Sequence, residues 1–154
     1  MQLKEVLGQY PKNEEYLIEI LLDYQKYKLH HDLTEKELKT IAEYLNITES
    51  KISSVITFYS LFSLQPKGTH VIQVCHDVPC HVNNQESILE TLKTLLDIDV
   101  DETTSDKMFS LEYTSCLGAC DKAPVMRIGE KTFTNLDTNK VKAIISEYRG
   151  KKHA

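Results

Sequence analysis

The sequence predicts an α+β protein, in which an N-terminal three-helix bundle at residues 1–67 precedes a domain with a four-stranded mixed sheet flanked by helices at residues 68–154. Apolar residues recur at helical spacing throughout the first part. Pro66-Lys67-Gly68 then interrupts this pattern, and a β-branched run from Val71 to Val74 follows. The total of 154 residues suits a compact domain with a helical extension.

Three amphipathic helices are predicted in the first part. The first covers about residues 12–28 and carries an apolar stripe. The second begins at Thr34-Glu35-Lys36-Glu37, a capping-box pattern in which the Thr34 and Glu37 side chains each accept a backbone N–H. The third follows Thr48, a residue type that favours the N-cap position. The sequence leaves open whether this bundle packs only on its neighbour or docks on another protein.

The second part alternates between strand and helix patterns. In order, the predicted elements are a strand at 71–74, a helix at 85–96 capped by Asn84, strands at 108–113, 125–128 and 131–134, and a helix at 138–149. The last two strands are separated by Gly129-Glu130, which predicts a hairpin because glycine accepts a positive φ. The order suggests a βαβ opening followed by a hairpin, as in a thioredoxin-like sheet.

Composition and charge exclude several classes of protein. The formal net charge is -5, which is not typical of a nucleic-acid-binding protein. The sequence has no apolar signal-peptide region at its start and no run approaching the ~20 apolar residues of a membrane span. We therefore expect a cytoplasmic protein without membrane insertion of its own, or one peripheral to a membrane complex.

All four cysteines lie in the second part. Cys75 and Cys80 form a C-x4-C pair, and Cys116 and Cys120 form a C-x3-C pair. Each pair follows directly on a predicted strand, at the point where the strand passes into a loop. If those two strands are neighbours in one sheet, both loops emerge at the same edge and four thiolates can converge.

Four thiolates in two pairs suit a [2Fe-2S] cluster, in which each iron takes two of them. The cluster carries a formal charge of about -2, and about -3 after reduction, so backbone N–H donors must approach the sulfurs. Leu117-Gly118-Ala119 has the small residues that allow this approach. The sequence therefore predicts that one [2Fe-2S] cluster, which is both the metal site and the cofactor, is bound by Cys75, Cys80, Cys116 and Cys120.

Other roles for the cysteines fit their spacing less well. Structural zinc sites favour C-x2-C knuckles, a redox dithiol favours C-x-x-C, and a cysteine nucleophile needs a partnered base. Inert buried thiols would not all be paired at loop entries. His76 and His81 suggest a Rieske centre, but a residue adjacent to a cysteine in an extended loop points away from it. We expect these histidines to be loop side chains or donors that tune the potential.

Two segments make the sequence resemble the thioredoxin-like [2Fe-2S] ferredoxin family. They are VIQVCHDVPCH at residues 71–81 and YTSCLGACDKAPVMRIG at residues 113–129. The segment ITESKISSVITFYSLFSLQPKGTHVIQVC, residues 47–75, also resembles the family's passage from helical bundle to cluster domain. Many members have Arg-Gly before the helix that follows the second cysteine, whereas Asn83-Asn84 stands here, and this difference concerns the packing of the loop.

The resemblance implies a thioredoxin-like second domain with one [2Fe-2S] cluster on the four cysteines. Relatives of this type are the small iron-sulfur subunits of NADH dehydrogenase and of NAD(P)-linked hydrogenases and formate dehydrogenases. In such assemblies the subunit contacts a larger flavoprotein that binds FMN, NAD(H) and a [4Fe-4S] cluster, and the helical bundle contributes to that contact. FMN and NAD(H) are therefore expected on the partner subunit only.

The resulting functional hypothesis is a non-catalytic electron-relay subunit of a multisubunit NAD(P)-dependent oxidoreductase, such as an NADH dehydrogenase or an electron-bifurcating hydrogenase. The sequence contains no Gly-rich dinucleotide fingerprint, nucleophile elbow or paired carboxylates at meaningful spacing, so no catalytic residue is predicted. Two alternatives stay open. The chain could be a zinc-stabilised adaptor without redox activity, or a stand-alone ferredoxin that shuttles freely.

Overall fold

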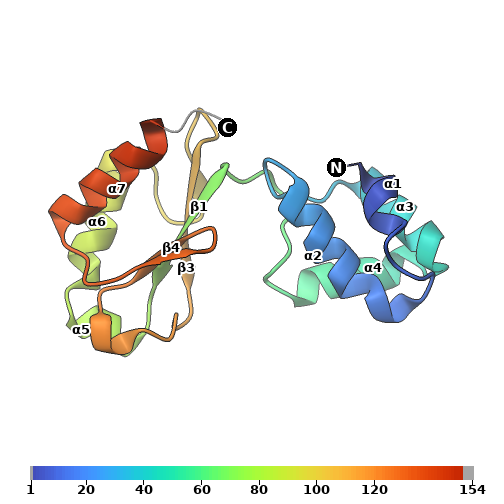
Figure 1. The fold of residues 1–154 in the computed structure, drawn as a ribbon, viewed down its shortest axis with the longest axis horizontal. Coiled ribbons are helices and arrows are strands. Elements are labelled where there is room, and N and C mark those ends of the chain that lie inside the picture. Colours follow the sequence, from blue (N-terminus) through green and yellow to red (C-terminus); the bar gives the residue numbers. More distant parts are fainter. Residues whose placement is uncertain (1, 151–154) are drawn as a thin grey trace. The chain divides into compact units, whose positions relative to one another are not determined.

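The computed structural model describes residues 2–150 (Figure 1). The chain divides into two compact units, Met1–Lys67 and Gly68–Ala154. Each unit has an apolar core of its own. The first is helical and the second combines a sheet with helices, so the predicted α+β class is confirmed. No helix within the described residues is both long and apolar enough to cross a membrane.

The described part of the first unit contains four α-helices and one 3-10 helix, so the predicted three-helix bundle is corrected. The elements are α1 (Leu3–Leu7), η1 (Glu14–Tyr16), α2 (Leu17–Tyr27), α3 (Glu35–Leu45) and α4 (Glu49–Phe58). Helix α1 was not predicted because five residues are too few to show helical periodicity. Its Val6 and Leu7 side chains are buried in the core of the unit, so tertiary packing stabilises it.

Side chains at the predicted N-caps fix where α3 and α4 begin. The Thr34 N–H donates to Glu37 Oε2 at 2.9 Å, and the reciprocal bond to the Thr34 side chain completes the capping box. The Thr48 hydroxyl accepts the Lys51 N–H at 3.2 Å. Both predicted caps are therefore confirmed, because each satisfies backbone donors that the first helical turn leaves free.

The described part of the second unit contains five strands, not the four predicted. Its elements are β1 (His70–Cys75), α5 (Val78–Val82), α6 (Gln85–Leu96), β2 (Glu102–Thr103), β3 (Phe109–Thr114), η2 (Cys120–Lys122), β4 (Met126–Ile128), β5 (Lys131–Phe133) and α7 (Thr138–Gly150). The additional strand, β2, is a two-residue edge strand that pairs antiparallel with β3. Two residues carry no alternating pattern, so only the neighbouring strand defines β2.

The sheet has the order β2-β3-β1-β4-β5, with β1 and β3 parallel and β4 antiparallel to β1. Ile72 and Val74 of β1, Leu111 of β3 and Met126 of β4 share one core with α6 and α7. Figure 1 shows α6 and α7 side by side next to the sheet. The parallel pairing of β1 and β3 is what the convergence of the two cysteine loops required.

The β4–β5 hairpin confirms the turn that the sequence predicts. Ile128 pairs with Lys131 across Gly129-Glu130, and Gly129 has a φ of +58°. Strand β4 begins at Met126 rather than at Val125. Val125 therefore lies just outside the strand, and its backbone carbonyl accepts a hydrogen bond from Cys75.

Gly68 stands where the second unit begins, and only glycine fits there. A Cβ at this position would lie 2.4 Å from the carbonyl carbon of Phe109, which is far below contact distance. The Gly68 N–H donates to the Ser110 hydroxyl at 2.7 Å. The chain thus enters β1 in close backbone contact with β3, which requires a residue without a side chain.

Candidate metal centre

The first cysteine pair is buried at the end of β1. Cys75 is the last residue of β1, and Cys80 lies in the five-residue helix α5. Each is only 1% exposed. Val125 packs against both. Its carbonyl accepts the Cys75 N–H at 3.3 Å, and its own N–H acts on the Cys80 thiol by lowering the pKa of that group.

The second cysteine pair lies in the exposed turn after β3. The sulfur atoms of Cys116 and Cys120 are 3.3 Å apart, and both residues are exposed. The Gly118 N–H donates to Cys116 Sγ at 3.4 Å. Gly118 has a φ of +76°, a conformation that glycine adopts without strain. The small residues between these cysteines therefore bring a backbone donor to the sulfur, as expected.

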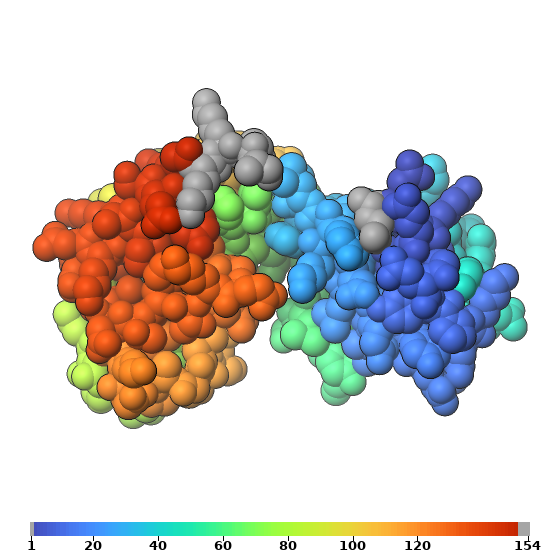
Figure 2. All heavy atoms as spheres, in the orientation of Figure 1, coloured from blue at the N-terminus to red at the C-terminus, as the bar shows by residue number. Residues whose placement is uncertain are grey.

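The sheet brings the two pairs together. Cys75 pairs with Thr114 in the parallel register of β1 and β3, so both loops leave the sheet at the same edge. The Cys120 thiol is near enough to Cys75 and Cys80 for the three groups to influence one another electrostatically. Figures 1 and 2 show the segment around residue 120, in orange, beside the yellow-green segment around residue 80.

The pKa values of the thiols show what this environment does to a negative charge. Burial, and then the neighbouring Cys75 thiol, raise the pKa of Cys80 to about 11, although the Val125 N–H opposes the rise. The hydrogen bond shared with Cys116, and then burial, raise the pKa of Cys120. Four thiolates would repel one another here, so a positively charged metal is needed to hold them ionised.

The donor set fits a [2Fe-2S] cluster. The thiols come as one buried and one exposed pair, and each pair has a backbone N–H directed at sulfur, from Val125 and from Gly118. Two irons that each take two thiolates match this grouping. Within residues 2–150, no three His, Cys, Asp or Glu side chains are arranged to hold a single metal ion.

The two loop histidines lie beside this centre. The His76 ring contacts the Tyr113 ring with their centroids 4.4 Å apart. His81 is exposed on α5. Their role as donors that tune the potential stays a prediction.

Two residues next to the cysteines were not identified from the sequence. The sequence predicts Val125 only as part of a strand and Gln85 only as a helix position. Gln85 is 5% exposed, and its amide Nε2 lies 3.4 Å from the Val125 carbonyl. Neither residue type indicates a metal site, so only their place in the fold reveals them.

Asn84 is the N-cap residue of α6, but it does not cap the helix as predicted. Its side chain makes no capping hydrogen bond, and its φ is +68°. Asparagine tolerates this left-handed conformation better than most residues do. The residue thus provides a backbone turn where many family members were expected to have glycine.

The sequence matches the thioredoxin-like [2Fe-2S] ferredoxin family over residues 3–149. It is 32% identical to the second E-type subunit of NADH-quinone oxidoreductase from Rhizobium meliloti (strain 1021), over 96% of this chain and 87% of that protein. It is 29% identical to HndA, a subunit of the NADP-reducing hydrogenase of Solidesulfovibrio fructosivorans, over 90% and 80%. It is 39% identical to the E-type subunit of NADH-quinone oxidoreductase from Escherichia coli (strain K12), over 73% and 68%.

The fold is also similar to part of a solved hydrogenase. The crystal structure of an NAD+-reducing [NiFe]-hydrogenase in the air-oxidized state superposes with a TM-score of 0.79 over 92% of this chain, at 19% identity. The chain spans about a quarter of that hydrogenase chain, namely 24%. At this identity the superposition shows the fold alone. The match over residues 3–149 shows that the chain belongs to the thioredoxin-like [2Fe-2S] ferredoxin family and carries one [2Fe-2S] cluster.

Proposed function

We propose that this chain is an electron-relay subunit of a multisubunit NAD(P)-dependent oxidoreductase and holds its [2Fe-2S] cluster on Cys75, Cys80, Cys116 and Cys120. The observation that carries this proposal is the meeting of two thiol pairs at the ends of two neighbouring parallel strands. Every cysteine of the chain takes part. When bound, the cluster supplies one-electron chemistry, since it can be reduced and reoxidised by one electron.

The protein's part in this function is to hold, shield and expose the ligands. Cys75 and Cys80 lie in an apolar cluster with Val125 and are almost completely buried, which limits the access of bulk solvent from that side. Cys116 and Cys120 lie at the surface, so electrons can pass to and from a partner over a short distance. Donors from Gly118 and Val125 stabilise the negative charge on sulfur.

A larger flavoprotein subunit that binds FMN, NAD(H) and a [4Fe-4S] cluster is the proposed electron partner. The names of the relatives support this, because they are subunits of NADH-quinone oxidoreductases and of an NADP-reducing hydrogenase. The first unit supports it physically. Phe58, Leu61 and Leu64 are 80%, 56% and 49% exposed, which is much apolar surface around the end of α4. We assign docking on that partner to residues 1–67 and the cluster to residues 68–154.

Iron and sulfide analysis tests the cluster assignment. We expect about two irons and two sulfides per chain, a visible absorption that dithionite bleaches, and a one-electron paramagnetic signal. Replacing any one of the four cysteines by alanine should lower iron content and signal together, whereas Ser115→Ala in the same turn should not. Equimolar zinc without visible absorption would contradict the proposal and support the adaptor.

Co-purification tests the assignment to a complex. A tagged copy expressed in its own cells should bring down a flavin-containing subunit, and replacing both Phe58 and Leu61 by serine should weaken that association. The double variant should keep its iron content, because the substitutions lie in the other unit. A chain that remains alone while holding its cluster would instead be a stand-alone ferredoxin.

A further inference from the structure

We propose that Gln85 is a positioning residue of the cluster site, which holds the Val125 carbonyl against the Cys75 backbone so that the Val125 N–H can stabilise the buried sulfurs, and which thereby raises the reduction potential. This inference rests on the proposed ligand set. Gln85 touches no reacting atom in this scheme and acts only through Val125. Nothing in its residue type or sequence position indicates such a role.

The contacts around the Val125 carbonyl define the geometry. This oxygen accepts the Cys75 N–H at 3.3 Å and faces the Gln85 Nε2 at 3.4 Å. One buried carbonyl is thus held by the backbone of one proposed ligand and by the first residue of α6. Fixing the carbonyl restricts the backbone torsions of Val125, and therefore the direction of its N–H toward Cys80.

Only one orientation of the Gln85 amide is compatible with this contact. A carbonyl cannot donate, so the reverse orientation would bring two acceptors face to face. With Nε2 on Val125, the amide Oε1 is buried and has no hydrogen-bond partner among the described residues. Because a buried acceptor without a partner is costly, an apolar side chain would suit the site better if Gln85 only filled space.

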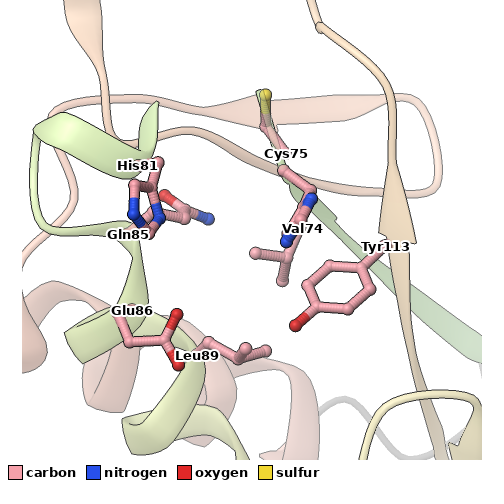
Figure 3. Close-up of a pocket in the computed structure, with 8 residues that line it drawn as sticks. Val74, Cys75, His81, Gln85, Glu86, Leu89 and Tyr113 are labelled. Carbon is pink, nitrogen blue, oxygen red and sulfur yellow. The ribbon is translucent and has the colours of Figure 1, made fainter. Parts of the chain in front are cut away.

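The Gln85 side chain borders a small cavity next to the cysteines. The cavity has a volume of about 10 Å³, which is near the smallest space that can hold one water molecule. Cys75, Val74, Leu89 and Tyr113 also line it. Figure 3 shows Gln85 reaching from the start of α6 toward Val74 and Cys75 of β1, with Tyr113 on the opposite side. The amide therefore lies between α6 and the cluster loop.

The effect on the cluster follows from charge. Reduction adds a negative charge that is shared with the sulfurs, so an N–H···S hydrogen bond favours the reduced form. Weakening the bond at Cys80 should make reduction less favourable. Gln85 thus raises the potential relative to a variant that packs equally well but cannot donate to the Val125 carbonyl.

Redox potentiometry of the purified chain tests this proposal. Gln85→Met removes the donor at nearly constant volume, and Leu89→Met changes the packing of the same cavity without reaching Val125. We compare the variants at the midpoint potential of the wild-type protein. At that potential, the ratio of reduced to oxidised cluster in Gln85→Met should be threefold to tenfold lower than in the wild type. For a one-electron couple this corresponds to a midpoint potential that is about 30–60 mV lower. Leu89→Met should stay within twofold. The g-values of the reduced cluster should also change in Gln85→Met and not in Leu89→Met.

Three results would overturn the proposal. They are an unchanged reduction potential in Gln85→Met, an equal shift of the potential in Leu89→Met, or a higher potential in Gln85→Met than in the wild type. If Gln85→Met does not retain two irons, Gln85→Leu replaces it, since its uncharged side chain also cannot donate. A Gln85→Leu potential at or above that of the wild type overturns the idea. Wild-type protein without iron and sulfide would instead contradict the proposed ligand set.

Discussion

Glu37 is the most connected carboxylate of the first unit, and its removal offers a quantitative test of how that unit is stabilised. Its oxygens accept the Tyr24 hydroxyl at 2.5 Å, the Thr34 N–H at 2.9 Å and the Lys28 ammonium at 2.9 Å. The side chain is 20% exposed. One carboxylate thus caps α3 and joins it to residues of α2 and the segment after it.

The pKa of Glu37 gives the expected magnitude. Partial burial alone would raise it, but the bonds from Tyr24, Thr34 and Lys28 lower the pKa to about 2, from an ordinary value of 4.5. The Tyr24 hydroxyl shows the reciprocal effect, since burial and then its bond to Glu37 raise its pKa. After allowance for solvent screening, the depressed pKa corresponds to about 2 kcal/mol of folding free energy at neutral pH.

The sign of the pH dependence follows from the direction of the shift. Because the folded pKa lies below the unfolded one, the contribution is complete above about pH 4.5 and is lost as the pH falls toward about 2. Glu37→Gln should therefore lower the free energy of unfolding by about 2 kcal/mol at pH 7. The difference from the wild type should narrow steadily below pH 4.5.

Urea unfolding followed by the tyrosine signal can measure this difference. Six of the eight tyrosines lie in residues 1–67 and two in residues 68–154, so the signal reports mainly on the first unit even when acid releases the cluster. Glu43→Gln is the matched control, because Glu43 is exposed on the same helix. Equal unfolding free energies for Glu37→Gln and wild type at pH 7, or a difference that does not vary with pH, would contradict this role of Glu37.

Three further predictions concern mainly the second unit. Gly68→Ala should destabilise it by about 3 kcal/mol in urea unfolding, since the added Cβ would overlap the backbone of β3, whereas Gly8→Ala in the first unit, with its nearest atom at 3.4 Å, should cost little. Asn84→Gly should be neutral or stabilising and Asn84→Ala should cost about 1 kcal/mol, because φ is +68°, as circular dichroism melts would show. In protein freed of iron, iodoacetamide should label exposed Cys116 well before buried Cys80, and mass spectrometry should find the two rates clearly different.

Local sequence patterns predicted the longer elements well. The capping box at Thr34 and Glu37, the cap at Thr48 and the turn at Gly129 all form as expected. Each depends on residues within about four positions of one another, so the chain carries the information locally. Helices and strands with several periods of apolar residues were found for the same reason.

Short elements could not be predicted in this way. Helices α1 and α5 have five residues each and β2 has two, so none shows a readable period. Packing partners distant in sequence stabilise them, as β3 does for β2. The conformation of Asn84 likewise reflects the path that the loop must take, not the capping preference of its side chain.

The proposed ligand set could be predicted without coordinates, because residue type and pairing along the chain indicate which side chains are able to bind iron. The folded chain was needed to show that one pair is buried and the other exposed, and that Gln85 and Val125 lie beside the buried pair. Burial depends on which distant strands and helices pack around a side chain. Residues that are ten and fifty positions from Cys75 in the sequence become its neighbours only when the sheet forms.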